Sequence, residues 1–323
     1  MKMKIFCTLG PSTFNKKFLK FINGKVDLVR INMSHMSLKK LKEIIKFIKK
    51  YSKVPICLDT EGAQIRTKVK REQRYNVNQN LNIYKNEAKN FSLYPENIFE
   101  QIKVKDILEL GFTGLIVKVI KSSSNQLNCK VLTKGKLETN KGVHLKNRKL
   151  KMNYLTQKDF QAIKIAKKNK IKFYALSFTN SIADVKKFNN ILANKTKIFK
   201  LETKSAIKNL NEIMKQGKNF LIDRGDLSKD ISIEQIPIAQ RKILALGKKR
   251  KKNIYVATNF LESMIKSDIP NRGEVNDIYN TLELGAAGLV LAAETAIGRY
   301  PESCINILKK IINVFNKNKK KFK

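Results

Sequence analysis

The chain has 323 residues, 67 of them basic and 26 acidic, which gives a formal net charge of +41. It contains no run of about 18 apolar residues and no signal-peptide core at its N-terminus, so we expect neither a membrane span nor secretion. A chain of this length has room for one large domain, alone or with a small one. The four cysteines show no metal-binding spacing and are typical of a protein in the reducing cytoplasm.

The positive charge raises the question of an anionic partner, such as nucleic acid or a membrane surface. Only ten of the basic residues are arginine, and the lysines are spread along the whole chain. Specific recognition of phosphates and bases favours arginine. We therefore expect neither a nucleic acid nor a membrane to be the main partner.

Short apolar runs alternate with amphipathic helical patterns along most of the chain. This alternation is typical of parallel α/β structures, and eight strands are the number that closes a TIM barrel. The sequence therefore predicts an α/β fold of the (β/α)8 type. Helices are expected at 37–50 and 182–192, with Ser181 as the N-cap of the second. The expected strands are 5–9, 28–31, 54–58, 173–178, 197–202, 219–225, 254–259 and 288–294.

One segment interrupts the alternation after the third expected strand. Roughly 95 residues separate that strand from the helix that begins near Thr156, far more than a connecting loop needs. Strand-like pieces such as 115–120 and 127–132 indicate that 68–141 is a small all-β domain, inserted where a lid would lie. We expect residues 1–67 and 142–323 to form the barrel.

Charged residues follow two consecutive expected strands. The first ends at Lys200 and Glu202, and the second ends at Arg224 and Asp226. Because alternate residues of a strand face the same side, Lys200 and Glu202 share a side and lie about 6–7 Å apart along the strand. Barrel enzymes carry their catalytic groups at these carboxyl ends. Carboxylate oxygens suit Mg²⁺, so the pattern predicts a site for a divalent cation and an anionic substrate, rather than a solvated rim of charge.

Polar residues follow the other expected strands as well. We interpret the set as functional, because scattered surface charge would not concentrate at strand ends. Single members such as Thr8, Thr60 and His35 also fit purely structural roles. The set comprises Thr8, Arg30, Asn32, Ser34, His35, Asp59, Thr60, Arg66, Thr258, Glu294 and Thr295.

Ten short motifs cover these positions. In chain order they are CTLGPS, RINMSH, LDTEGAQIRT, KGVHL, SFTNSIADV, KLE, RGDL, VATNFLESM, NRGEVND and AAETAIGRYPE. Their order and spacing resemble the pyruvate kinase family over nearly the whole chain. The resemblance implies Mg²⁺-dependent phosphoryl transfer from phosphoenolpyruvate to ADP, which gives pyruvate and ATP in glycolysis. The family's C-terminal regulatory domain is expected to be absent, which would favour simpler regulation and a monomer or homodimer.

The resemblance also implies roles for individual residues. Glu202 and Asp226 would hold Mg²⁺, and Lys200 would lie against the transferring phosphoryl group. Gly225 and Asp226 would receive the substrate carboxylate. Thr258 would touch the substrate near the enolate carbon and assist proton delivery.

Further positions match phosphate, potassium and nucleotide contacts of the family. Arg30 and Arg66 would bind phosphates from two sides, since guanidinium groups match phosphate oxygens. The residues that match the K⁺ site are Asn32, Ser34, Asp59 and Thr60. The residues that match nucleotide (ADP/ATP) contacts are Asn32, Ser34, His35, Arg66 and Lys141.

Three departures from the family pattern affect these expectations. Gln64 stands where potassium-dependent members carry Glu and independent members carry Lys. The aspartate-rich lid turn of the family falls at 109–111, which contains no aspartate. Asp223 replaces a small residue and adds negative charge near the anion site.

Two other functions remain open from the residues alone. One is a Mg²⁺-dependent barrel lyase or aldolase that acts on a pyruvate-like substrate, although such an enzyme would not need Lys200, the paired arginines or a lid. The other is a catalytically inactive, basic binding protein, which would explain the charge but not the retained site residues.

Overall fold

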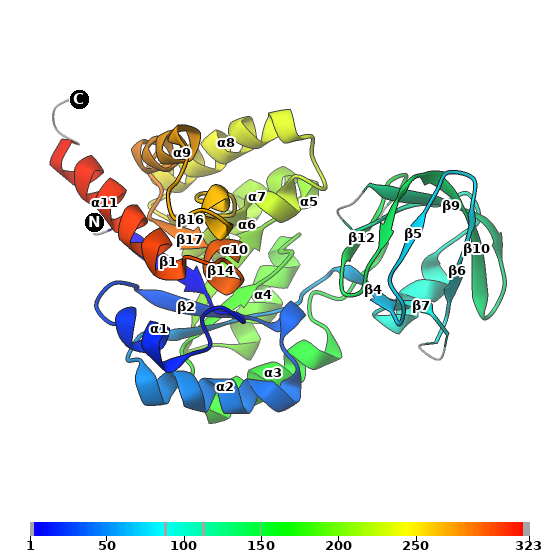
Figure 1. Cartoon of the computed structure of the whole chain (residues 1–323), viewed down its shortest axis with the longest axis horizontal. Helices are drawn as coiled ribbons and strands as arrows, with labels where there is room; N and C mark the ends of the chain where they lie inside the picture. Colours follow the sequence, from blue (N-terminus) through cyan, green and yellow to red (C-terminus); the bar gives the residue numbers. More distant parts are fainter. Residues whose placement is uncertain (1–2, 87–88, 112–113, 149, 319–323) are drawn as a thin grey trace. The chain divides into compact units, whose positions relative to one another are not determined.

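The structure is a computed structural model that describes residues 3–86, 89–111, 114–148 and 150–318 (Figure 1). The chain forms two compact units, Met1–Gly62 with Gln157–Lys323 and, inserted between them, Ala63–Thr156. The inserted unit extends beyond the expected 68–141 at both ends. The reason is that β4 (Ile65–Val69) and β12 (Gly142–Leu145) pair with each other and belong to its sheet.

The first unit is a closed barrel of parallel strands in the order β1-β17-β16-β15-β14-β13-β3-β2. Each strand expected from the sequence is present, with its ends shifted by a few residues, and the (β/α)8 prediction is confirmed. The strands are β1 (Lys4–Thr8), β2 (Leu28–Asn32), β3 (Ile56–Asp59), β13 (Phe173–Leu176), β14 (Thr196–Leu201), β15 (Asn219–Asp223), β16 (Asn253–Ala257) and β17 (Gly288–Leu291).

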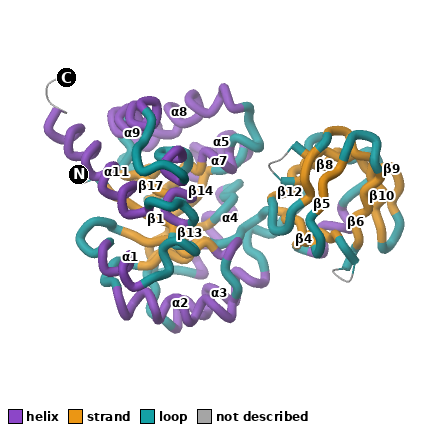
Figure 2. The backbone as a smooth tube through the Cα atoms, in the orientation of Figure 1, coloured by secondary structure: helices purple, strands orange, loops and turns teal. Residues whose placement is uncertain are grey.

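Helices surround these strands (Figure 2). Helix α2 shows why: its apolar residues Leu41, Ile45 and Ile48 recur at three- and four-residue spacing and are buried. The predicted N-cap Ser181 begins α4, and its hydroxyl accepts a hydrogen bond from the Asp184 backbone N–H. None of the described helices has the length and apolar character needed to cross a membrane. The α-helices are α1 (Lys16–Phe21), α2 (Leu38–Tyr51), α3 (Gln157–Lys168), α4 (Ile182–Ile191), α5 (Lys204–Lys208), α6 (Leu210–Gln216), α7 (Arg224–Leu227), α8 (Ile236–Lys249), α9 (Arg272–Glu283), α10 (Ala293–Ala296) and α11 (Pro301–Asn318). The short 3₁₀ helices of this unit are η1 (Met33–His35), η3 (Ile233–Gln235) and η4 (Glu262–Ile265).

The interior of the large barrel is layered along the strands. An apolar cluster takes residues from all eight strands: Phe6, Leu28, Cys57, Ala175, Ile198, Leu221, Tyr255, Ala257 and Val290. Side chains two positions apart on a strand face the same side. A polar layer therefore follows this apolar layer toward the carboxyl ends of the strands. It contains Thr8, Arg30, Asp59, Ser177, Lys200 and Asp223, all of them buried.

The second unit is a smaller closed barrel in the order β10-β6-β7-β4-β12-β8-β9, accompanied by the pair β11-β5. It has its own core of buried residues, including Leu81, Phe91, Leu108, Val117 and Val131. Its remaining elements are β5 (Gln73–Tyr75), β6 (Asn80–Tyr84), β7 (Phe91–Tyr94), η2 (Glu96–Gln101), β8 (Ile107–Leu110), β9 (Leu115–Ser122), β10 (Gln126–Thr133) and β11 (Gly135–Leu137).

Candidate active site

Lys200 lies at the centre of the polar layer, near the end of β14. Its side chain is 5% exposed, and Nζ lies 2.7 Å from Oε1 of Glu202, 3.5 Å from Oδ2 of Asp59 and 3.6 Å from Oδ2 of Asp223. The ammonium group also donates a hydrogen bond to Oγ of Ser177 at 3.2 Å. The charged ends of Lys200 and Glu202 meet on one side of the strand, as the alternation of side chains predicts.

Burial and neighbouring charges act against each other in this layer. Burial alone would lower the pKa of Lys200, but Asp59, Glu202 and Asp223 together raise it above its usual value. Burial alone would raise the pKa of Asp223, yet Lys200 and Arg30 lower it. For Glu202, burial raises the pKa to about 8 although Lys200 opposes the shift. Lys200 is therefore a permanently charged group in a site of low dielectric constant.

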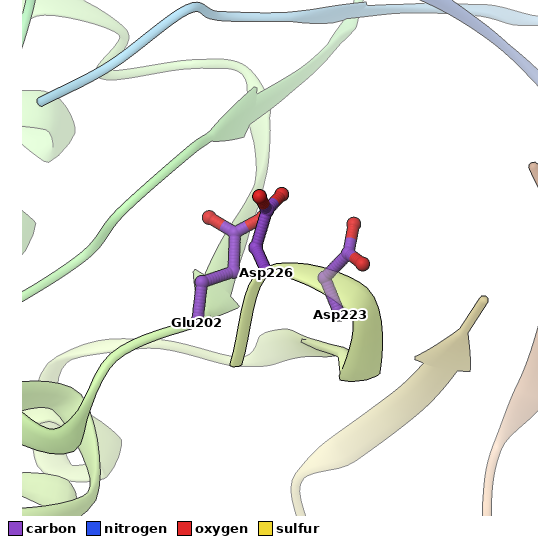
Figure 3. Close-up of side chains that lie close together, drawn as sticks. All are labelled: Glu202, Asp223 and Asp226. Atoms are coloured by element: carbon purple, nitrogen blue, oxygen red, sulfur yellow. The ribbon is translucent and has the colours of Figure 1, made fainter. Parts of the chain in front are cut away.

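Two of the carboxylates beside Lys200, those of Glu202 and Asp223, form a cluster with the carboxylate of Asp226. Glu202, Asp223 and Asp226 each place a carboxylate oxygen within 4.8 Å of the others, and Figure 3 shows the three groups gathered at the ends of β14 and β15. Glu202 is fixed because its Oε2 accepts a hydrogen bond from the Phe178 backbone N–H at 2.6 Å. Hard oxygen donors in this number fit Mg²⁺, which fills its other positions with water or substrate oxygens.

Arg30 and Asp59 form a buried ion pair on neighbouring strands. Nη2 of Arg30 lies 2.9 Å from Oδ2 of Asp59, and the two side chains are 4% and 0% exposed. Within the described part of the chain, Nε and Nη1 of Arg30 have no hydrogen-bond partner. A buried guanidinium with two unused donors fits an anionic ligand such as a phosphoryl group.

Thr258 follows β16 and is held in an unusual conformation. Its φ is +81°, a left-handed value that β-branched residues rarely adopt. Its Oγ1 donates a hydrogen bond to Oδ1 of Asp223 at 2.6 Å, and its carbonyl oxygen accepts bonds from Nε and Nη2 of Arg224 at 3.0 and 2.5 Å. Gly225 packs against it so closely that an added Cβ would lie 2.9 Å from Cγ2 of Thr258. The position of the Thr258 hydroxyl is therefore tightly determined.

The four expected potassium ligands lie on two adjacent strand ends. Asn32 is directly opposite Asp59 in the β2–β3 pair, and Ser34 and Thr60 follow them. Several of these oxygens already have partners: Oδ1 of Asn32 accepts from the Ser34 backbone N–H at 2.9 Å, and Oγ1 of Thr60 accepts from the Ser177 backbone N–H at 3.1 Å. The donor chemistry suits K⁺, but the carboxylate of Asp59 is already paired with a guanidinium.

The expected nucleotide contacts are divided between the two units. His35 lies in η1 of the large barrel and is exposed. Arg66 lies on β4 of the small barrel, opposite Gly142 of β12, and Nη1 of Arg66 donates to the Asn140 carbonyl oxygen at 3.2 Å. Lys141 immediately precedes β12, and Nζ lies 3.9 Å from Oε1 of Glu138. Arg66 and Lys141 are thus close to each other within the small barrel.

Two residues of the site were missed in the sequence. Ser177 directly follows β13, and Oγ donates to the Thr60 carbonyl oxygen at 2.7 Å. Its position near the end of the expected strand 173–178, at the start of the motif SFTNSIADV, was a signal that could have identified it. Lys158 lies in the first turn of α3, and Nζ contacts both the Met33 carbonyl oxygen and Oε1 of Glu61 at 2.6 Å. No sequence signal marked Lys158, because its partners are far away in the chain.

Comparisons with known proteins agree with this architecture. The sequence profile of the pyruvate kinase barrel domain matches residues 1–305. A pyruvate kinase of Thermotoga maritima is 33% identical over 95% of this chain and 70% of its own length. Pyruvate kinases of Staphylococcus aureus strains MRSA252 and USA300 are each 30% identical over 96% of the chain, which spans 56% of their length. The chain therefore belongs to the pyruvate kinase family.

Proposed function

We propose that the protein catalyses the pyruvate kinase reaction of glycolysis, the Mg²⁺-dependent transfer of a phosphoryl group from phosphoenolpyruvate to ADP. One observation carries the proposal: a buried, charged lysine lies among the carboxylates of Glu202, Asp223 and Asp59. This arrangement offers a fixed positive charge next to Glu202, one of the two proposed oxygen ligands for a divalent cation. Both are needed when negative charge shifts between oxygens in phosphoryl transfer.

In the proposed reaction, the bond between phosphorus and the enol oxygen breaks and a bond to the terminal phosphate oxygen of ADP forms. Lys200 stabilises the charge on the transferring group, because it is preorganised and shielded from water. Arg30 contributes its unused Nε and Nη1 donors to the same phosphoryl oxygens.

Glu202 and Asp226 are the proposed Mg²⁺ ligands, and Gly225 and Asp226 receive the substrate carboxylate. When bound, the metal would offset charge that develops on the enolate oxygen. Thr258 borders the enolate carbon, which must take up a proton to give pyruvate. Arg66, Lys141, His35, Asn32 and Ser34 remain the proposed nucleotide contacts.

The proposed setting is the cytoplasm. Cys7, Cys57, Cys129 and Cys304 are all buried and unpaired, which suits a compartment that keeps thiols reduced.

The test is a coupled assay of pyruvate formation from phosphoenolpyruvate and ADP with Mg²⁺. Lys200→Ala should lower kcat by about 10²- to 10³-fold, because it removes charge stabilisation from the transition state. Lys197→Ala is the matched control: Lys197 belongs to the same strand, but its Nζ bonds the Leu192 and Ala193 carbonyl oxygens at the amino end of the barrel. It should retain wild-type activity.

A wild-type chain that makes no pyruvate under these conditions would contradict the proposed function, and the lyase and binding-protein alternatives would then be the ones to test. Near-normal turnover in Lys200→Ala would contradict the role given to Lys200 alone.

A further inference from the structure

Asp223 connects the two halves of the proposed chemistry. It ends β15, two residues beyond Leu221 of the apolar layer, and is 8% exposed. One carboxylate oxygen, Oδ1, accepts the hydrogen bond from Oγ1 of Thr258 at 2.6 Å, and the other, Oδ2, lies 3.6 Å from Nζ of Lys200. Its two oxygens therefore face the group at the phosphoryl position and the group at the proton-transfer position.

The hydrogen bond to Asp223 determines what the Thr258 hydroxyl can do. A hydroxyl has one hydrogen to donate and two lone pairs that accept. Because Thr258 gives its hydrogen to Asp223, only its lone pairs remain for other molecules in the site. An ionised carboxylate accepts but never donates, so the direction of this bond is fixed.

The backbone of Thr258 is held as firmly as its side chain. Nε and Nη2 of Arg224 both donate hydrogen bonds to the Thr258 carbonyl oxygen. The third nitrogen of Arg224, Nη1, lies 2.7 Å from Oδ2 of Asp277. The Arg224 guanidinium also stacks over the Phe260 ring at 4.3 Å. Such support is needed to keep a β-branched residue at a φ of +81°. Oγ1 of Thr258 is thus fixed in position, and it can only accept further hydrogen bonds.

We propose that Asp223 is a positioning residue that holds Thr258 as the hydrogen-bond acceptor for the water that protonates the enolate carbon. The inference rests on the proposed function. One O–H bond of this water points to Oγ1 of Thr258 and the other to the carbon. In the step, that second O–H bond breaks and a C–H bond forms. The hydroxide left behind takes a proton from the solvent, so one proton is consumed for each pyruvate formed.

Asp223 acts through Thr258 in this scheme and does not contact the substrate. One of its oxygens lies within 4.8 Å of carboxylate oxygens of Glu202 and Asp226. Because Oδ1 already accepts from Thr258 and Oδ2 faces Lys200, the proposal assigns Mg²⁺ to Glu202 and Asp226 and not to Asp223. The scheme therefore separates proton delivery from metal binding, and the two can be measured independently.

The experiment uses the full chain and three variants. Asp223→Ala removes the acceptor, Asp223→Asn keeps an acceptor oxygen without the charge, and Thr258→Val removes the hydroxyl. The proton step is followed as deuterium uptake into the methyl group of pyruvate in deuterium oxide, by NMR, with Mg²⁺ and ATP present. Metal binding is followed separately with Mn²⁺ by calorimetry, without substrate.

Asp223→Ala and Thr258→Val should each slow deuterium uptake by about 100-fold, the size expected for loss of an oriented proton donor. Asp223→Asn should restore most of that rate. In Asp223→Ala, kcat should fall and its solvent isotope effect should rise, whereas KM for phosphoenolpyruvate and the Mn²⁺ affinity should stay near wild type. Asp27→Asn is the control, because Asp27 pairs with Lys4 at 2.9 Å at the opposite end of the barrel. Circular dichroism checks the folding of each variant.

Three results would overturn the proposal: wild-type deuterium uptake in Asp223→Ala, no recovery in Asp223→Asn, or loss of Mn²⁺ binding in Asp223→Asn, which would make Asp223 a metal ligand. All three presuppose a wild-type chain that turns over. If the wild type neither forms pyruvate nor exchanges its methyl protons, the proposed function itself fails. If Asp223→Ala is unfolded, the rate of deuterium uptake in Asp223→Asn is compared with that in Thr258→Val. The proposal expects a much faster rate in Asp223→Asn, and equal rates would overturn it.

Discussion

Asp59 is the only charged residue among the four that match the potassium site of the family. In this chain its carboxylate lies 2.9 Å from Nη2 of Arg30 and 3.5 Å from Nζ of Lys200, so two cations already offset its charge. Gln64, which is neutral, stands at the position where relatives carry Glu or Lys. The site therefore has oxygen donors for K⁺, but it has little uncompensated negative charge that would attract the ion.

We expect potassium to activate the enzyme by a few-fold, or ~1 kcal/mol of activation free energy, less than in relatives that carry glutamate at this position. The measurement is activity in tetramethylammonium buffer with and without potassium chloride at constant ionic strength, because added salt alone would change electrostatic screening. Replacing Asp59 would break its ion pairs. Thr60→Val, which removes the hydroxyl of another expected K⁺ ligand, is therefore the better variant for testing the potassium site. Equal rates with and without potassium would show that the inherited site is not used.

At the level of single residues, the side of a strand on which a residue lies was predictable from the sequence. Lys200 and Glu202 are two positions apart, so the pleat of the strand places them on one side. Asp223 was placed near the anion site from the family pattern alone, and the same rule, applied from Leu221, gives the physical reason for its position. Lys158 could not be found this way, because its position depends on how α3 packs, and no local pattern encodes that contact.

Among the elements, the segment between η2 and β8 is fastened to the chain that follows β12. The carboxylate of Asp106 accepts hydrogen bonds from Nε and Nη2 of Arg148 at 2.8 and 2.6 Å, and from the Lys103 backbone N–H at 2.8 Å. Burial alone would raise the pKa of Asp106, but these hydrogen bonds and the charge of Arg148 lower it below its usual value. The ionised form is therefore the one that the folded small barrel favours.

We expect Asp106→Asn to lower the free energy of unfolding of the small barrel by about 2 kcal/mol at neutral pH, as for hydrogen bonds to a charged group. Because the pKa of Asp106 is lower in the folded state, this stabilisation is present above the unfolded pKa and disappears as the pH falls below about 4. Urea unfolding of both proteins at several pH values tests this. A difference that persists unchanged in acid would contradict the assigned ion pair.

Element boundaries were predicted less well than the elements themselves. The strands of the large barrel were recognisable as apolar runs, because both of their faces are covered. The limits of the inserted unit were not, since β4 and β12 continue directly from barrel loops and become part of the small sheet only by pairing with each other. Long-range pairing of this kind leaves no composition change at the boundary.

On the scale of the whole molecule, each of the two units has apolar residues of its own buried inside its barrel. The small barrel buries its own cluster, which includes Phe91, Leu108 and Val117, within Ala63–Thr156. A unit of this size can bury enough apolar surface to fold alone.

We expect a fragment of residues 63–156 to fold into the same β-barrel. Dispersed amide signals in a proton–nitrogen NMR spectrum and a cooperative thermal transition would show this. The variant Leu108→Asp, which places a charge in the core of the barrel, is the control and should be unfolded. A fragment with the spectrum of a disordered chain would show that the small barrel depends on the large one.

The alternation of apolar and polar layers also affects how this protein loses its activity when it unfolds. Most strands of the large barrel supply a member of the core, such as Cys57 or Ile198, and two positions later a member of the polar layer, such as Asp59 or Lys200. Hardly any strand can detach from the barrel without also removing a residue of the polar layer, which forms part of the proposed active site. On heating or in denaturant, few partly unfolded forms of the large barrel should therefore keep catalytic activity. Loss of activity and loss of the large barrel should be the same event, and a preparation at half its activity is a mixture of intact and inactive molecules.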